Sequence, residues 1–97
     1  MIGLKIVFMP EKEEQFLQRI NTKQTEAFRE LFSEFYNSLV LFAMGFVEQQ
    51  DVAEDIVQET FITVWENKKT FNSYQGLKAY LYELVQNKCT NYLKHRQ

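Results

Sequence analysis

Apolar side chains recur along this chain at steps of three and four residues, the spacing that places them on one face of a helix. The longest stripe predicts a helix from about residue 22 to residue 47, with Thr22 as its candidate N-terminal cap. A shorter stripe in residues 11–20 follows Pro10 and predicts a preceding short helix, because proline and glutamate both suit a first helical turn. The apolar positions of these two helices are Phe16, Leu17, Ile20, Phe28, Leu31, Phe32, Phe35, Leu39, Phe42, Ala43 and Phe46.

A third stripe begins after a polar break near residue 48. Asp51 is a candidate N-cap for this helix, and Glu54 three residues later completes an acidic variant of the capping box. The residues expected to face the core are Ala53, Val57, Phe61 and Val64.

The fourth stripe follows residues 67–76, whose composition is typical of a loop. Asn72 or Ser73 is the expected cap of a helix that runs from about residue 74 to residue 96. Its core positions are expected to be Leu77, Tyr80, Leu81, Leu84, Val85, Cys89, Tyr92 and Leu93.

Together these patterns predict an all-α fold, a compact bundle of three to four helices. We expect residues 1–22 to form an N-terminal tail and a short helix, and residues 23–97 to form one helical domain. The chain has 97 residues, three glycines and one proline. That length suits one domain, and the scarcity of chain breakers favours long helices over a β fold with many turns.

The charges of the chain are unevenly distributed. Residues 51–66 carry five acidic and no basic side chains, a net charge of −5. Residues 67–97 carry six basic side chains against Glu83 alone, a net charge of +5. This asymmetry indicates either two surfaces with different partners or two solvated helix faces that attract each other.

Catalytic and metal chemistry find little support in the residue types. His95 is the only histidine and lies near the C-terminus, so no nucleophilic triad or zinc site is expected, and we predict that the chain is not an enzyme and has no cofactor. Asp51, Asp55 and Glu59 have a spacing that can offer carboxylates to a metal, but a solvated helix face is the simpler interpretation.

The single cysteine, Cys89, cannot form an internal disulfide, which fits the reducing cytoplasm. No stretch approaches the roughly 20 apolar residues of a membrane span, so membrane insertion is not expected.

The acidic helix predicted from residue 51 onward also carries uncharged side chains among its carboxylates. Its carboxylates are interrupted by Gln58, Ile62 and Trp65. Carboxylates accept bidentate hydrogen bonds from arginine, and exposed apolar side chains add buried area, so this pattern favours docking onto another helix. The alternative is that Ile62 and Trp65 belong to the core.

The last segment interleaves aromatic residues with lysines. Aromatic faces that stack on bases, beside cations that neutralise phosphates, are typical of proteins that bind single-stranded nucleic acid. Asparagine side chains at positions 72, 87 and 91 can also read base edges. Tyr74 and Tyr82 are the expected exposed aromatics, whereas Tyr80 and Tyr92 lie on the core stripe. The alternative is that all these aromatics are packed and the lysines are merely solvated.

Three segments carry a resemblance to a known family: AFRELFSEFYNSLVLFAMGFV, DVAEDIVQETFITVWEN and LKAYLYELVQNKCTNYLKHR. Over about residues 25–97 the chain resembles the second conserved region of bacterial sigma factors, most of all the extracytoplasmic-function (ECF) group. The middle segment is the most specific, with its acidic start, its VQETF run and its closing tryptophan. Asn91 departs from the family pattern, which often has an acidic residue there, and the family's second DNA-binding domain has no counterpart in residues 1–97.

The resemblance implies two binding surfaces in transcription initiation. The acidic helix would dock on a coiled coil in the clamp of the largest subunit of the RNA polymerase core. The loop and last helix would melt the minus-ten promoter element and hold its non-template single strand, with a base flipped from the stack. The implied polymerase-binding residues are Asp51, Asp55, Gln58, Glu59 and Ile62. The implied DNA-binding residues are Lys69, Asn72, Ser73, Tyr74, Lys78, Tyr82, Asn87, Asn91 and Lys94.

The resemblance also implies a cytoplasmic protein with an anti-sigma factor as a further partner. A second hypothesis is a helical protein–protein interaction module, for example one that binds a regulator and makes no direct contact with DNA. Binding of DNA discriminates between the two.

Overall fold

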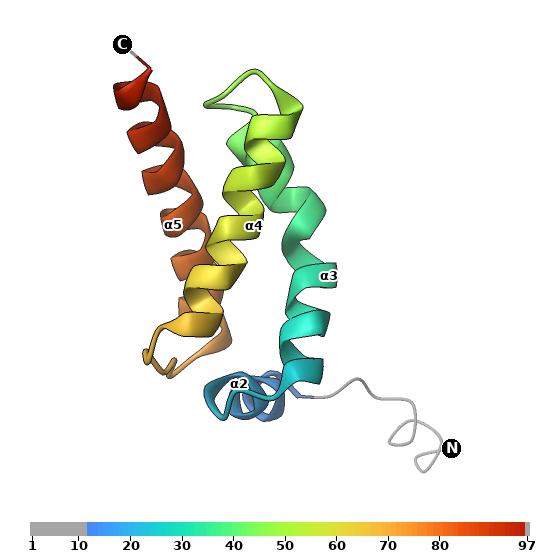
Figure 1. The fold of residues 1–97 in the computed structure, drawn as a ribbon. Coiled ribbons are helices and arrows are strands. Elements are labelled where there is room, and N and C mark those ends of the chain that lie inside the picture. The colour runs from blue at the N-terminus through green and yellow to red at the C-terminus, as the bar shows by residue number, and fades with distance from the viewer. Residues whose placement is uncertain (1–11, 97) are drawn as a thin grey trace, which may run out of the picture.

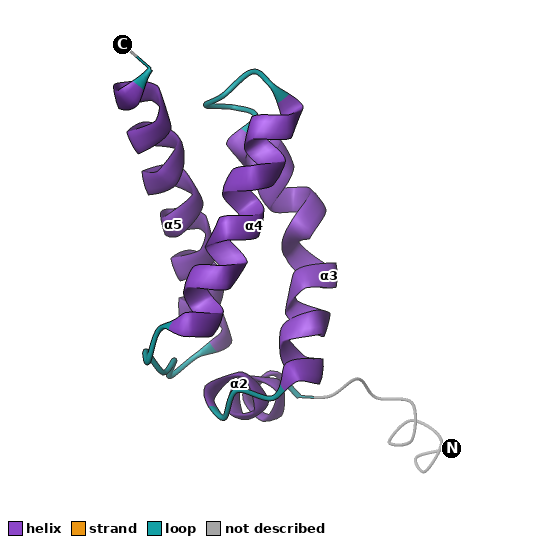
Figure 2. Ribbon diagram, viewed as in Figure 1, coloured by secondary structure: helices purple, strands orange, loops and turns teal. Residues whose placement is uncertain are grey.

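Four helices joined by short turns make up the part of the chain that the computed structural model describes, residues 12–96. They are α2 (Glu13–Asn21), α3 (Thr25–Ala43), α4 (Gln50–Glu66) and α5 (Tyr74–His95). No strand occurs in this range, and Figure 2 shows the helices joined only by loops and turns. The all-α prediction is confirmed. The tail predicted at the start of residues 1–22 lies outside the described residues.

The three long helices run up, down and up beside one another (Figure 1). Helix α4 contacts both α3 and α5, and α3 also contacts α5. The short α2 lies across one end of this bundle, where it contacts α3 and α5. The loop between α4 and α5 is at that same end, so residues far apart in sequence meet there.

Each long helix turns one apolar stripe inward. On α5 the fully buried residues recur every four positions, as expected for one face of a helix. Burial of one such side chain stabilises the fold by about 1.5–3 kcal/mol. The buried residues of the bundle include Leu31, Phe35, Leu39, Val57, Phe61, Val64, Leu77, Leu81, Val85 and Cys89.

Two predicted helix caps are wrong and one is confirmed. Thr22 does not begin α3. It closes α2, where its hydroxyl donates to the carbonyl of Gln18 at 2.9 Å, and Gln24 takes the N-cap position of α3. Asp51 lies inside the first turn of α4, because the helix begins one residue earlier, at Gln50. Ser73 caps α5 as predicted, and its hydroxyl accepts the backbone N–H of Gly76 at 2.9 Å.

The predicted capping box at the start of α4 is also absent. Gln49 is the N-cap residue and makes no side-chain cap bond. The Glu54 carboxylate instead accepts the side-chain amide of Gln50 at 2.9 Å. Asp51 still places negative charge in the first turn, near the positive end of the helix dipole, which favours the helix without a cap bond.

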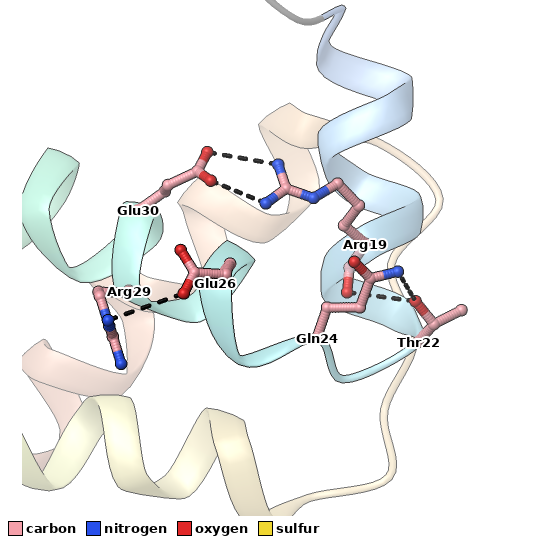
Figure 3. A network of polar contacts seen from close by, with 6 residues as sticks. All are labelled: Arg19, Thr22, Gln24, Glu26, Arg29 and Glu30. Carbon is pink, nitrogen blue, oxygen red and sulfur yellow. Dashed lines mark hydrogen bonds and ion pairs between the residues drawn. The ribbon is translucent and has the colours of Figure 1, made fainter.

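An ion pair ties α2 to α3. The guanidinium of Arg19 donates to both carboxylate oxygens of Glu30, at 2.7 and 3.4 Å (Figure 3). Leu17 and Ile20 lie buried on the inner face of the same helix. The hydrogen bond from Arg19 lowers the pKa of the Glu30 carboxyl below its ordinary value of 4.5.

The Arg19–Glu30 pair is expected to make the stability of the fold depend on pH. Because the folded-state pKa of Glu30 is depressed, its stabilisation is present above the unfolded value of 4.5 and is lost as pH falls through the folded value. Glu30→Gln should therefore lower the melting temperature at neutral pH and have a smaller effect at about pH 2.5. The control is Glu26→Gln, one helical turn away, whose partner Arg29 is 3.7 Å distant within α3. Equal effects of Glu30→Gln at both pH values would contradict this assignment.

Candidate functional site

The five residues predicted to bind polymerase share one face of α4. Asp51, Asp55, Gln58, Glu59 and Ile62 are all exposed, and their spacing of three or four residues brings them together on the side away from the core. The opposite side of the helix is buried between α3 and α5. The structure thus assembles the whole predicted set into one surface, which we call the α4 face.

Ile62 of the α4 face and the nearby Trp65 belong to the surface and not to the core. Ile62 is 54% exposed and Trp65 is 42% exposed. The Trp65 ring packs edge-on against Phe28 of α3, with 4.7 Å between ring centroids. The alternative that Ile62 and Trp65 belong to the core is therefore wrong.

An apolar groove of about 540 Å³ runs between α3 and α4 beside this face. Phe32 was predicted to be part of the core, but it lies in this groove and is 39% exposed. The prediction fails because the apolar stripe of α3 is wider than the area that its neighbours cover, and no sequence pattern reports that area. The groove is lined by Thr25, Phe28, Arg29, Phe32, Ser33, Gln58, Phe61, Ile62 and Trp65.

The α4 face keeps most of its negative charge. Glu59 has a cation nearby, with its carboxylate 3.9 Å from the Lys88 ammonium of α5. Exposed pairs at that distance are weak, about 0–1 kcal/mol. Within residues 12–96 no ion pair involves Asp51 or Asp55. These carboxylates remain available to basic side chains of a partner.

The two tyrosines expected to be exposed are only partly so. Tyr74 packs between Phe16 and Phe35, with both ring centroids 6.2 Å away. Its burial, together with nearby carboxylates, raises the pKa of its hydroxyl. Tyr82 packs edge-on against Phe42 of α3 at 4.9 Å. Both rings therefore contribute to packing, which weakens their assignment as free stacking platforms.

The predicted DNA-binding residues of α5 divide between two sides of the helix. Lys78 and Tyr82, four residues apart, share the flank that meets α3. Asn87, Asn91 and Lys94 share another flank. Nine residues separate Lys78 from Asn87, which corresponds to a rotation of roughly 180° on an α-helix. The structure does not bring these two groups together.

The loop before α5 borders a hollow of about 460 Å³. The ammonium of Lys69 lies 5.2 Å from the ring centroid of Tyr80, and the Tyr80 hydroxyl accepts the side-chain amide of Asn67 at 3.0 Å. Tyr80 was predicted to be core and is instead half-buried at this hollow. The hollow is lined by Lys69, Thr70, Phe71, Asn72, Ser73, Gly76, Ala79, Tyr80 and Glu83.

A second hollow, of about 420 Å³, lies on the α2 side of the same loop. Two carboxylates, from Glu13 and Glu14, face it together with Lys12 and the side chains of residues 72–74. The first hollow has one lysine and one carboxylate, so it is the less repulsive of the two for a phosphate backbone.

Comparison with known proteins decides the family. The family model described as sigma-70 region 2 matches residues 31–97. The chain belongs to the sigma-70 region 2 family. The matched part of this region 2 domain contains α4, the loop and α5, whereas α2 and the start of α3 precede it.

Two curated proteins of Haemophilus influenzae are similar to this region 2 domain. A probable RNA polymerase sigma factor is 33% identical over 58 residues, which cover 60% of this chain and 30% of that protein. An ECF RNA polymerase sigma-E factor is 26% identical over 81 residues, which cover 84% of this chain and 42% of that protein. The chain spans less than half the length of these relatives. No solved structure matches it significantly.

The described part of the region 2 domain contains neither a candidate metal cluster nor a membrane-spanning helix. Residues 12–96 contain no group of three or more His, Cys, Asp or Glu side chains that could hold a metal ion. None of the described helices is both long and apolar enough to span a membrane. Cys89 is buried in the core, and burial raises the pKa of its thiol.

A stability comparison tests whether Ile62 belongs to the surface. Ile62→Ser should change the free energy of unfolding by no more than about 0.5 kcal/mol, as is usual for exposed positions. Phe61→Ala, one residue earlier on the buried side, should destabilise by about 3–5 kcal/mol. Urea denaturation of the two variants measures both values. A large loss with Ile62→Ser would mean that the residue is part of the core.

Proposed function

We propose that this domain docks through the α4 face on the clamp coiled coil of the polymerase largest subunit and opens the minus-ten promoter element. The observation that carries the proposal is the α4 face itself, where carboxylates and an exposed isoleucine lie beside an apolar groove. The sigma-factor names of both relatives support it. The loop and the flank of α5 beside it would then hold the non-template single strand.

Docking on the clamp would use charge and apolar burial together. Asp55 and Glu59 would accept hydrogen bonds from basic side chains of the coiled coil. An apolar side chain of the coiled coil would pack in the groove beside Ile62, and the contact would remove both side chains from water. Loss of one partner from such a charge pair costs about 2–5 kcal/mol once the pair is buried.

Strand capture would use the hollow beside Tyr80. Stacking of one base on an aromatic ring contributes about 1–3 kcal/mol, and flipping a base from the duplex costs a few kcal/mol. Lys69 above the ring would neutralise a phosphate. Tyr80, Asn87 and Asn91 follow at steps of seven and four residues, so they share a flank along which a strand can continue to Lys94. Lys78 and Tyr82 would contact a different part of the DNA.

The second hypothesis, a module that binds only proteins, is favoured by the partial burial of Tyr74 and Tyr82. In that case the groove between α3 and α4 would receive a regulator alone. An anti-sigma factor that covers the α4 face is compatible with both hypotheses, so binding of single-stranded DNA decides between them.

Charge reversal on the α4 face is expected to weaken docking. In a calorimetric titration with the isolated clamp coiled coil of a bacterial polymerase, Asp55→Lys and Glu59→Lys should each weaken binding by at least tenfold, or about 1.4 kcal/mol. Glu34→Lys introduces the same charge change on an exposed position of α3 and should bind as the wild type does.

Absence of binding by the folded wild-type domain, to a coiled coil that binds an established sigma factor, would remove the docking proposal. Equal binding by all four proteins would show that the interface lies elsewhere.

Strand capture predicts that Tyr80→Leu weakens binding of single-stranded DNA, because leucine preserves much of the packing and removes the stacking surface. The expected loss is about 1–3 kcal/mol. Tyr82→Leu is the matched control on the other flank and should have a smaller effect. Fluorescence anisotropy of a labelled oligonucleotide at low salt measures both, and a larger effect of Tyr82→Leu would reverse the assignment of the flanks.

A further inference from the structure

The turn between α2 and α3 has an unusual backbone. Lys23 has a φ of 61°, in the left-handed region where glycine is the usual residue. The backbone N–H of Gln24 donates to Arg19, and that of Lys23 donates to Ile20, each at 3.0 Å. These bonds form the Schellman motif that ends many helices. A side chain at this position is unfavourable by about 1–2 kcal/mol, so a compensating contact is expected.

The Lys23 side chain supplies that contact. Its ammonium donates to the backbone carbonyls of Val64 and Trp65, at 3.0 and 2.9 Å. These carbonyls lie in the last turn of α4, where helical carbonyls lack partners and the dipole attracts cations. Helix α4 has no basic residue of its own in that turn. Lys23 therefore caps the C-terminus of α4 from another element.

Two residues earlier, Asn21 holds the loop that follows α4. Its side-chain amide donates to the carbonyl of Phe71, and its side-chain oxygen accepts the N–H of Phe71, both at 2.8 Å. These residues are 50 positions apart. An amide provides a donor and an acceptor side by side, which matches the two polar groups of one backbone residue. The Phe71 ring is buried and lies 5.4 Å from Tyr80.

We propose that Asn21 is a positioning residue that holds the loop of residues 67–73 in the shape that captures single-stranded DNA. Lys23 fixes the same turn to the end of α4, so this one turn sets the position of the loop relative to the α4 face. The inference rests on the proposed function, and it assigns a role to a turn that precedes residue 31, where the family match begins.

The two bonds matter because the loop has no regular structure of its own. Lys69 and Asn72 lie within two residues of Phe71 on either side. A loop that is already fixed avoids the entropy cost of ordering these side chains when DNA binds. Without Asn21, the buried ring would still anchor Phe71, but its backbone would lose both partners and the flanking residues would sample more conformations.

Asn21→Ala and the control Thr22→Ala test this inference in the full chain. Within residues 12–96 the hydroxyl of Thr22 bonds to the backbone carbonyls of Gln18 and Arg19 and to the side-chain amide of Gln24; Figure 3 shows the contacts with Arg19 and Gln24. None of these bonds involves the loop of residues 67–73, so their loss leaves the bonds of Asn21 in place. The probe for DNA is a short fluorescein-labelled single strand of random sequence, and the probe for docking is the isolated clamp coiled coil. Amide hydrogen exchange at Phe71 reports on the loop directly.

Asn21→Ala should bind the single strand roughly five- to tenfold more weakly, the factor expected for ordering one or two further side chains. Its affinity for the coiled coil should stay within about twofold of wild type, because α4 keeps its core contacts and its Lys23 cap. Exchange at Phe71 should become faster. Thr22→Ala should match wild type in all three measurements, and Asn21→Asp, which keeps only the acceptor, should resemble Asn21→Ala.

Three results would contradict the inference. Wild-type affinity of Asn21→Ala for the single strand would remove the positioning role while leaving strand capture intact. Equal losses in DNA and coiled-coil binding would mean that Asn21 serves general stability alone. Absence of DNA binding by the wild type would instead overturn strand capture, and the positioning role with it.

Discussion

The packing of α4 between α3 and α5 is the constraint on which the rest of the structure depends. Because Ala53, Val57 and Val64 are buried on one side of the helix, the residues half a turn away face solvent. Those residues are the carboxylates and Ile62 of the α4 face. The same sequence period thus builds the core and presents the surface proposed to dock. A change of register in α4 would bury charge, which is strongly unfavourable unless the charge is paired.

The surface proposed to bind single-stranded DNA depends on contacts across the end of the bundle. The loop between α4 and α5 is held by the Ser73 cap on one side and by Asn21 on the other. Lys23 joins the same turn to the last carbonyls of α4. The arrangement places the hollow beside Tyr80 at a fixed position relative to the α4 face. A domain that docks through one surface can then use weak contacts at the other, because docking raises the local concentration of the strand.

The sequence predicted what depends on local periodicity and missed what depends on distant contacts. All four helices in the described range and their main buried faces follow from apolar spacing, and so does the grouping of the α4 face. The caps at Thr22 and Asp51 were misassigned, because several polar residues near each helix start compete for one position. The exposure of Phe32 depends on how far α4 covers α3, and the bonds of Asn21 join residues 50 positions apart. No pattern within a window of the sequence reports either.

Photo-crosslinking from position 62 tests the central claim most directly. A photoreactive amino acid in place of Ile62 would be irradiated in the presence of the RNA polymerase core, with Ser38, an exposed residue of α3, as the control position. The account predicts a crosslink from position 62 to the clamp coiled coil of the largest subunit, lost when Asp55→Lys is added, and none from position 38. A crosslink from position 62 to another subunit, or equal crosslinking from both positions, would contradict it.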